Sequence, residues 1–186
     1  MSTSNTNFRS TAGILMAVGF ILLIPLMAMQ FTDEVVWDLT DFAIAGALLT
    51  GTGFAYSLAA KRGGNLVYRI AVGIALAGAL MLVWMNLAVG IIGTPDNPAN
   101  LMYVAVLGVG IIGAILSRFQ AKGMSVTLFL TSFAQALAAV IASMAKLGDP
   151  VNGPKEIIIL NGFFVALWGG AGWLFKNAAA EKTAAL

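Results

Sequence analysis

Few side chains in this sequence carry polar groups inside otherwise apolar stretches, and these few decide what chemistry the chain can perform. The most informative of them are the hydroxyls of Thr50 and Thr52 and the amides of Asn86, Gln135 and Asn161. An amide surrounded by hydrocarbon must find a hydrogen-bonding partner on another helix or in water. Each of these residues therefore marks either a contact between helices or the wall of a polar cavity.

The positions of the amides support two interpretations. In the first, each amide joins two helices and contributes on the order of 0.6 kcal/mol. In the second, four residues converge on a cavity that opens to the outside and binds a cation or a small polar solute: Asp41, Trp84, Asn86 and Asn161. The lengths of the apolar runs place Asn86 roughly 10 Å and Asn161 roughly 6 Å below the outer ends of their helices.

Acidic residues gather around the mouth of this predicted cavity. They are Asp33, Glu34, Asp38 and Asp96, all in predicted outer loops. A surface with charges of one sign raises the local concentration of counter-ions. We therefore expect these four carboxylates to form an outer surface that attracts cations.

The composition excludes several kinds of chemistry. The chain has no cysteine and no histidine, so disulfides, thiol catalysis and metal or haem sites that use these ligands are ruled out. No ionisable residue lies in the middle of an apolar run, where ion-coupled pumps and proton relays usually carry one. We therefore expect a protein that is not an enzyme and has no catalytic residue, no metal site and no cofactor.

Two short motifs have structural explanations. Gly108, Gly110 and Gly113 have the spacing of a dinucleotide-binding fingerprint, but they lie within an apolar run instead of following a strand. We expect them to allow close contact between membrane helices. Asn97-Pro98-Ala99 matches the tripeptide of water channels, but the sequence has one copy where those channels have two. Asn97 and Pro98 instead fit the first residues of a helix.

The elements that must position these residues are apolar segments. The chain is 60% hydrophobic and 10% charged, with a mean hydropathy of +0.92, whereas soluble domains carry about 25% charged residues. Six segments without charge span residues 12–31, 42–60, 70–93, 101–117, 124–145 and 157–175. Each can cross about 30 Å of hydrocarbon as a helix. Helices are expected because a backbone in lipid must satisfy its own hydrogen bonds, and the alternation typical of barrel strands is missing.

The distribution of charge predicts the orientation of these helices. Eight of the ten basic residues fall on one side: Arg9, Lys61, Arg62, Arg69, Arg118, Lys122, Lys176 and Lys182. Only Lys146 and Lys155 fall on the other side, together with all the acidic residues except Glu181. Short loops rich in lysine and arginine stay in the cytoplasm. The amino and carboxyl ends are therefore predicted to be cytoplasmic.

Residues at the ends of the segments predict helix boundaries and membrane interfaces. Thr40 is expected to cap the second helix, and Pro154 is expected to open the sixth. Pro25 lies inside the first helix and should kink it. Trp37 and Tyr103 are expected at the outer membrane interface, where aromatic side chains are enriched.

These observations together predict an all-α, polytopic integral membrane protein, a six-transmembrane-helix bundle with both termini inside. Residues 1–11 and 177–186 form cytoplasmic tails around one membrane domain of residues 12–176. We expect this domain in the plasma (inner) membrane of a bacterium, in contact with membrane lipids. Nucleic acid is not an expected partner, because the basic residues are spread thinly over the segment ends.

Two functions fit this architecture. The leading hypothesis is a small non-enzymatic transport protein that forms a homo-oligomeric channel or a pathway for cations or small solutes. Small residues such as Ala47 and Gly51, four positions apart, favour the association of copies. The alternative is an accessory or scaffold subunit of a larger membrane complex, or a lipid-binding membrane protein.

Overall fold

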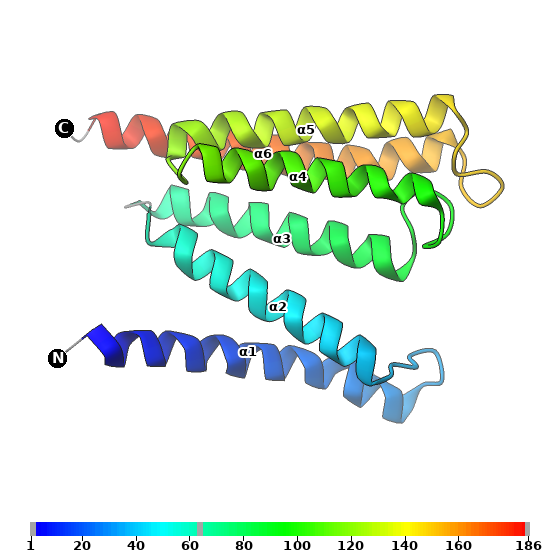
Figure 1. The fold of residues 1–186 in the computed structure, drawn as a ribbon, viewed down its shortest axis with the longest axis horizontal. Helices are drawn as coiled ribbons and strands as arrows, with labels where there is room; N and C mark the ends of the chain where they lie inside the picture. The colour runs from blue at the N-terminus through cyan, green and yellow to red at the C-terminus, as the bar shows by residue number, and fades with distance from the viewer. Residues whose placement is uncertain (1–2, 63–64, 185–186) are drawn as a thin grey trace. The chain divides into compact units, whose positions relative to one another are not determined.

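The structure is a computed structural model that describes residues 3–62 and 65–184, and all regular elements in these residues are helices (Figure 1). The elements in chain order are α1 (Thr3–Phe31), α2 (Leu39–Ala60), α3 (Leu66–Ala88), the 3-10 helix η1 (Pro98–Leu101), α4 (Met102–Leu116), α5 (Ala121–Met144) and α6 (Pro154–Ala184). Six helices, with η1 and α4 counted as one, are long and apolar enough to cross a membrane. The predicted all-α fold is confirmed, and six such helices suggest a multi-pass membrane protein.

The chain divides into two compact units, of which the first is Met1–Leu58. Within this unit α1 and α2 approach closely where α2 carries glycine. A Cβ atom at Gly53 would lie 2.7 Å from Ile14 Cγ2, and one at Gly46 would lie 3.6 Å from Leu22 Cδ1. Side chains of α1 thus occupy space that larger residues on α2 would fill. Pro25 lies inside α1, as the sequence predicts.

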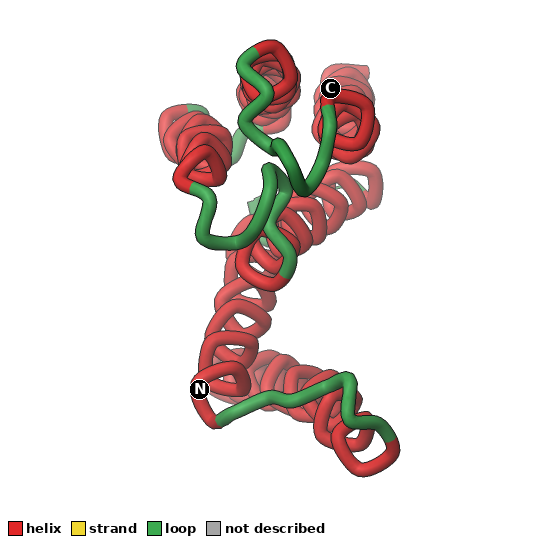
Figure 2. Tube along the Cα trace, turned by 90° about the vertical axis from the view of Figure 1, so that its right-hand side faces the viewer, coloured by secondary structure: helices red, strands yellow, loops and turns green. Residues whose placement is uncertain are grey.

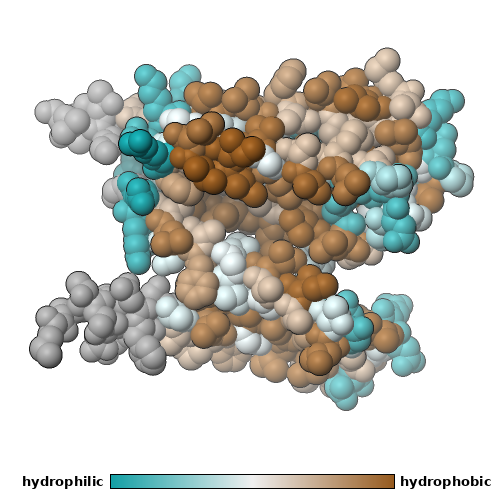
Figure 3. Space-filling model, in the orientation of Figure 1, coloured by the Kyte–Doolittle hydropathy of each residue, from teal (hydrophilic) through white to brown (hydrophobic). Residues whose placement is uncertain are grey.

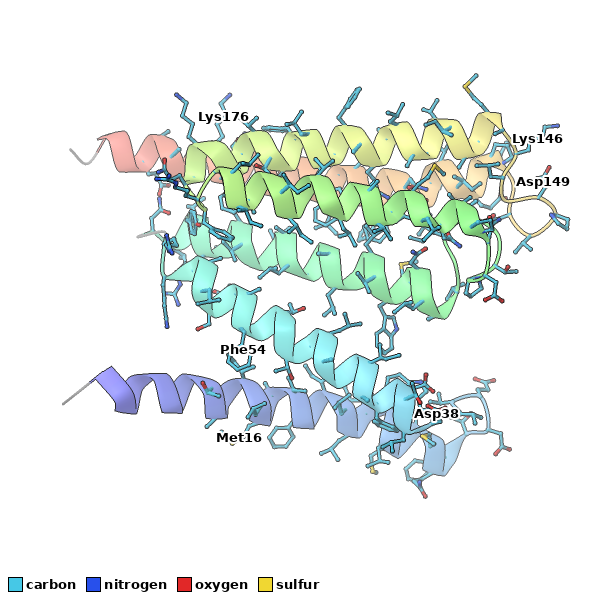
Figure 4. The ribbon with its side chains drawn as sticks, viewed as in Figure 1. Met16, Asp38, Phe54, Lys146, Asp149 and Lys176 are labelled. Carbon is cyan, nitrogen blue, oxygen red and sulfur yellow. The ribbon has the colours of Figure 1, made fainter. Side chains whose placement is uncertain are left out.

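The start of α2 differs from the prediction. Asp38 Oδ1 accepts a hydrogen bond of 2.9 Å from the backbone N–H of Asp41, and Asp41 Oδ2 accepts one of 2.9 Å from the backbone N–H of Asp38. This reciprocal pair is a capping box. The prediction that Thr40 caps α2 is therefore wrong, because α2 begins at Leu39 and the carboxylate of Asp38 accepts from the N–H of Asp41 at this helix end. Figure 4 shows Asp38 at this turn.

The second unit, Ala59–Leu186, contains α3, α4, α5 and α6. Within it α6 packs against α5 and α3, and α4 packs against α5 and, less extensively, against α3. Figure 2 looks along these four helices and shows them around a common interior. Figure 3 shows hydrophobic side chains along the middle of the unit and hydrophilic ones at its two ends, as expected for helices that span a bilayer.

Large side chains fill the interior of the second unit. Leu82, Phe164 and Phe175 are fully buried. Contact between α3 and α6 depends on Gly78, because a Cβ atom there would lie 3.1 Å from Trp168 Cζ3. The ring of Trp168 thus packs directly on the backbone of α3. Such close packing through small residues is what holds membrane helices together.

Helix α3 ends at Ala88, five residues before the predicted end of its apolar segment. Gly90 and Gly93 have φ angles of +78° and +68°, which only glycine adopts readily, so the chain leaves the helix here. Ile91 and Ile92, between these glycines, are fully buried, which explains why the apolar run of the sequence extends beyond the end of the helix. The predicted third segment is therefore too long at this end.

The starts of η1 and α6 follow the sequence prediction. The side chain of Asn97 accepts from the backbone N–H of Ala99 over 2.9 Å, and Pro98 is the first residue of η1. Pro154 opens α6, and Glu156 lies in its first turn. A carboxylate is favourable there because helix N-termini carry partial positive charge.

Candidate functional site

Four buried polar side chains form a hydrogen-bonded network inside the second unit. They are Tyr103 of α4, Gln135 of α5, and Asn161 and Trp168 of α6, with exposed fractions of 1%, 0%, 0% and 3%. Asn161 Oδ1 accepts from the Tyr103 hydroxyl over 3.0 Å and from Gln135 Nε2 over 2.7 Å. Trp168 Nε1 donates to Gln135 Oε1 over 3.4 Å. The network therefore joins three helices.

The amide of Asn161 is the centre of this network. Its oxygen uses both lone pairs, one for Tyr103 and one for Gln135. Its Nδ2 group donates to the carbonyl oxygen of Ile157, one turn earlier in α6, over 2.8 Å. This bond within α6 holds the side chain so that its oxygen faces the other two helices. A buried amide that is paired in this way avoids the penalty of an unsatisfied polar group.

Hydroxyl groups line the contact between α4 and α5. Thr127 and Thr131 donate to backbone carbonyl oxygens four residues earlier, over 3.0 and 2.9 Å, so neither hydroxyl is left unpaired in the interior. Gly113 and Gly110 of α4 lie against these threonines, since added Cβ atoms would come within 2.5 Å of Thr127 Cγ2 and 3.4 Å of Thr131 Oγ1. For these two glycines, the predicted role in helix contact is confirmed.

Asparagine side chains close one end of the unit, which we call the latched end. It consists of the α3–α4 loop, residues 89–97, and the α5–α6 loop, residues 145–153. Asn152 Oδ1 accepts from the Gly93 N–H over 2.8 Å, and Asn152 Nδ2 donates to the Ile91 carbonyl oxygen over 2.9 Å. Asn97 Nδ2 donates to the Leu147 carbonyl oxygen over 2.8 Å. The two loops are thus fastened to each other.

A further amide holds the α3–α4 loop against the start of α4. The side-chain oxygen of Asn100, in η1, accepts from the N–H groups of Ile91 and Ile92, over 3.2 and 2.9 Å. Its Nδ2 group donates to the carbonyl oxygens of Ile92 and Thr94, over 3.2 and 2.8 Å. Asn100 therefore satisfies four backbone groups of a segment that has no regular structure. This explains how the buried isoleucines can leave the helix without unpaired polar atoms.

The structure gives the four predicted ligand-binding residues different surroundings. Asn161 lies in the interior network, whereas Asn86 Nδ2 lies 3.4 Å from the Asn100 carbonyl oxygen at the latched end. Trp84, on the same helix, is 36% exposed. Asp41 belongs to the first unit, and the other three residues belong to the second. Their convergence on one cavity stays a prediction.

The end of α3 changes the position of Asn86. Asn86 lies two residues before Ala88, so it is about 3 Å from the helix end along the axis instead of 10 Å. Trp84 lies about 6 Å from the same end. Gly90 causes this difference because it ends the helix before the apolar run ends. Asn86 therefore lies in the last turn of α3, close to the α3–α4 loop.

The predicted acidic surface is exposed but belongs to two units. Asp33, Glu34, Asp38 and Asp96 are all exposed; the first three lie before α2 in the first unit and Asp96 lies in the α3–α4 loop. Asp38 and Asp41 also bond to each other's backbone as a helix cap. Among the residues that the structure describes, no three acidic side chains gather closely enough to hold a metal ion.

Sequence reasoning missed three of the residues that organise the second unit. Asn100 and Asn152 lie in or beside loops, where amides are common, so their role in fastening the latched end has no distinct sequence pattern. Tyr103 was expected at the membrane interface; its depth in a membrane stays a prediction, but its side chain is buried and bonds Asn161, a contact that the sequence did not indicate. Asn161 supplies the acceptor that a buried tyrosine hydroxyl needs.

Comparison with protein-family models, with curated proteins and with solved structures gives no match to this chain.

Proposed function

We propose that this chain is a non-enzymatic, multi-pass membrane protein that acts as an accessory or scaffold subunit within a larger membrane assembly. One observation carries this proposal: the polar side chains at the centre of the second unit, Tyr103, Gln135, Asn161 and Trp168, hydrogen-bond to one another instead of lining a path. Asn161 is completely buried between Tyr103 and Gln135. A unit of this kind is suited to hold its shape while its outer surface meets lipid and other helices.

The outer surface of α4 supports the same proposal. Val104, Ile111 and Ile115 are more than half exposed, so this helix presents large apolar side chains away from the interior. Lipid and partner helices both accept such a surface. We infer an orientation with the latched end outside and both termini in the cytoplasm of a bacterial cell, because eight of the ten basic residues are predicted on the cytoplasmic side and only Lys146 and Lys155 on the outer one.

A second candidate function is a homo-oligomeric channel or a pathway for cations and small solutes. It is favoured by Asn86, whose Oδ1 atom is buried and has no hydrogen-bond partner in the part of the chain that the structure describes. An amide oxygen of this kind can bind a cation or accept a hydrogen bond from a solute. The exposed carboxylates of Asp33, Glu34 and Asp96 would then attract cations. Such a pathway would run between copies, since the interior of the second unit is filled.

Extraction in a mild detergent distinguishes the two functions. For the scaffold subunit we expect a complex with other chains in fixed stoichiometry, and no cation flux when the chain alone is placed in liposomes. Homo-oligomers that conduct cations would support the channel and contradict the scaffold. Their flux should fall in Asn86→Leu and stay unchanged in the control Asn177→Leu, since Asn177 lies in the C-terminal part of α6.

A further inference from the structure

Three aromatic residues hold together the end of the second unit opposite the latched end, which we call the basic end. The Tyr68 hydroxyl donates to the Phe119 carbonyl oxygen over 2.6 Å. The rings of Tyr68 and Phe175 meet edge to face, with centroids 5.1 Å apart. Tyr68 and Phe175 are buried. The start of α3, the α4–α5 turn and the last third of α6 are therefore fixed to one another.

Each of these aromatic residues has a basic neighbour in the sequence. Arg69 follows Tyr68, Arg118 precedes Phe119, and Lys176 follows Phe175. All three basic side chains are exposed. Because the aromatic contacts fix the adjacent backbone, three cations are carried by a rigid part of the unit. Figure 4 shows Lys176 at this end and Lys146 with Asp149 at the other.

The turn that carries Arg118 has a backbone that few residues adopt. Arg118 and Phe119 have φ angles of +50° and +60°, in the left-handed region that disfavours residues with a side chain. Such a conformation persists only where surrounding contacts hold it. The hydrogen bond from Tyr68 to the Phe119 carbonyl oxygen is one such contact. The position of Arg118 is therefore determined by α3 as well as by its own turn.

Little negative charge offsets the cations at the basic end. Lys61, Arg62 and Lys122 add three more exposed basic side chains. Glu181 is the acidic residue on this side, and its Oε2 atom accepts from Asn65 Nδ2 over 2.8 Å. Within residues 3–62 and 65–184, neither Arg69 nor Arg118 nor Lys176 is in an ion pair. An anionic ligand would therefore meet uncompensated positive charge.

Exposed apolar side chains lie beside each of the three cations. Ile70 follows Arg69, Leu116 lies two residues before Arg118, and Trp173 lies one helical turn before Lys176. Their exposed fractions are 46%, 76% and 58%. A ligand that satisfies both kinds of side chain must carry an anionic group next to a long apolar part. This combination is the chemistry of an anionic phospholipid.

We propose that Arg69, Arg118 and Lys176 form a binding surface for the headgroup of an anionic phospholipid, with its acyl chains against the neighbouring apolar side chains. The proposal depends on the membrane embedding proposed above. Basic residues next to membrane helices attract anionic lipids, and each one near the surface changes the affinity about fivefold. Three such residues together should change the affinity on the order of a hundredfold.

Native mass spectrometry of the purified, delipidated protein tests this surface, with phosphatidylglycerol and phosphatidylcholine as probes. We expect tighter binding of phosphatidylglycerol, and loss of that preference in the triple variant Arg69→Gln/Arg118→Gln/Lys176→Gln. The control Lys146→Gln/Lys155→Gln, at the latched end, should keep it. Equal binding of the two lipids by the unaltered protein, or an unchanged preference in the triple variant, would overturn the proposal.

Additional variants and a competition experiment complete this test. If the triple variant does not fold, each single variant should weaken phosphatidylglycerol binding about fivefold, and no change in any of them would refute the surface. Arg69→Lys should retain the preference, because the charge is kept. Glycerol phosphate should not displace the lipid; displacement at equal concentration would mean that the surface binds free phosphate. Resistance to carbonate extraction tests the membrane embedding separately. A protein that resists extraction but shows no lipid preference would refute the lipid-binding surface and leave the proposed membrane embedding standing.

Discussion

Removing the hydrogen bond between Tyr103 and Asn161 should measurably destabilise the second unit. Tyr103→Phe deletes one hydroxyl and leaves Asn161 Oδ1 bonded to Gln135. A hydrogen bond between membrane helices contributes about 0.6 kcal/mol on average and up to about 1.7 kcal/mol. Asn161→Leu removes the acceptor of both bonds, so it should cost about 1 to 2 kcal/mol. The double variant should lose about 0.6 kcal/mol less free energy of unfolding than the two single variants added together. The reason is that the bond between the two side chains is lost only once.

Unfolding of the purified protein in mixed micelles with increasing dodecyl sulfate, followed by far-ultraviolet circular dichroism, measures these free energies. Tyr56→Phe is a matched control, since Tyr56 lies on α2 in the first unit and takes no part in the network. Additive effects of Tyr103→Phe and Asn161→Leu within the error would mean that the two side chains do not interact. That result would refute the hydrogen bond on which the interior network depends.

Two other variants test packing and the latched end. Gly113→Ala should destabilise the second unit by about 1 to 3 kcal/mol in the same unfolding assay, because the added Cβ would lie 2.5 Å from Thr127 Cγ2. The control Gly108→Ala should be neutral or slightly stabilising, because no atom lies within 4 Å of the added Cβ. Asn152→Ala removes the hydrogen bonds to Gly93 and Ile91, so the backbone amides of residues 91–93 should exchange hydrogen faster. The control Lys155→Ala should leave their exchange unchanged. Equal exchange rates in the two variants would contradict the role of Asn152 at the latched end.

Much of the fold follows from the sequence because the driving pattern is simple. Long stretches without charge predict helices, and a proline at the first helical position, Pro98 or Pro154, marks where two of them begin. Hydropathy does not, however, mark where a helix leaves the apolar region. Hydropathy placed the end of the third segment at Gly93, but Gly90 already ends α3. It also gave no signal for the start of α1 at Thr3 or for the continuation of α6 to Ala184.

The site was harder to predict because pairing between distant residues has no local pattern. Asn161 and Gln135 could be recognised as buried amides, since each interrupts an apolar run. Their bond to each other, and the bond to Tyr103, depend on which faces of α4, α5 and α6 meet. The same reason applies to the basic end, where Tyr68 reaches a turn 51 positions away in the sequence.

Labelling of single engineered cysteines tests most directly the claim that these helices span a membrane with the basic end inside. The chain has no cysteine of its own, so each added thiol reports on one position. With a maleimide that cannot cross membranes, Asp149→Cys at the latched end should react in intact cells. Lys122→Cys at the basic end should react only after the cells are lysed. Reaction of both positions in intact cells, or the reverse pattern, would contradict the account.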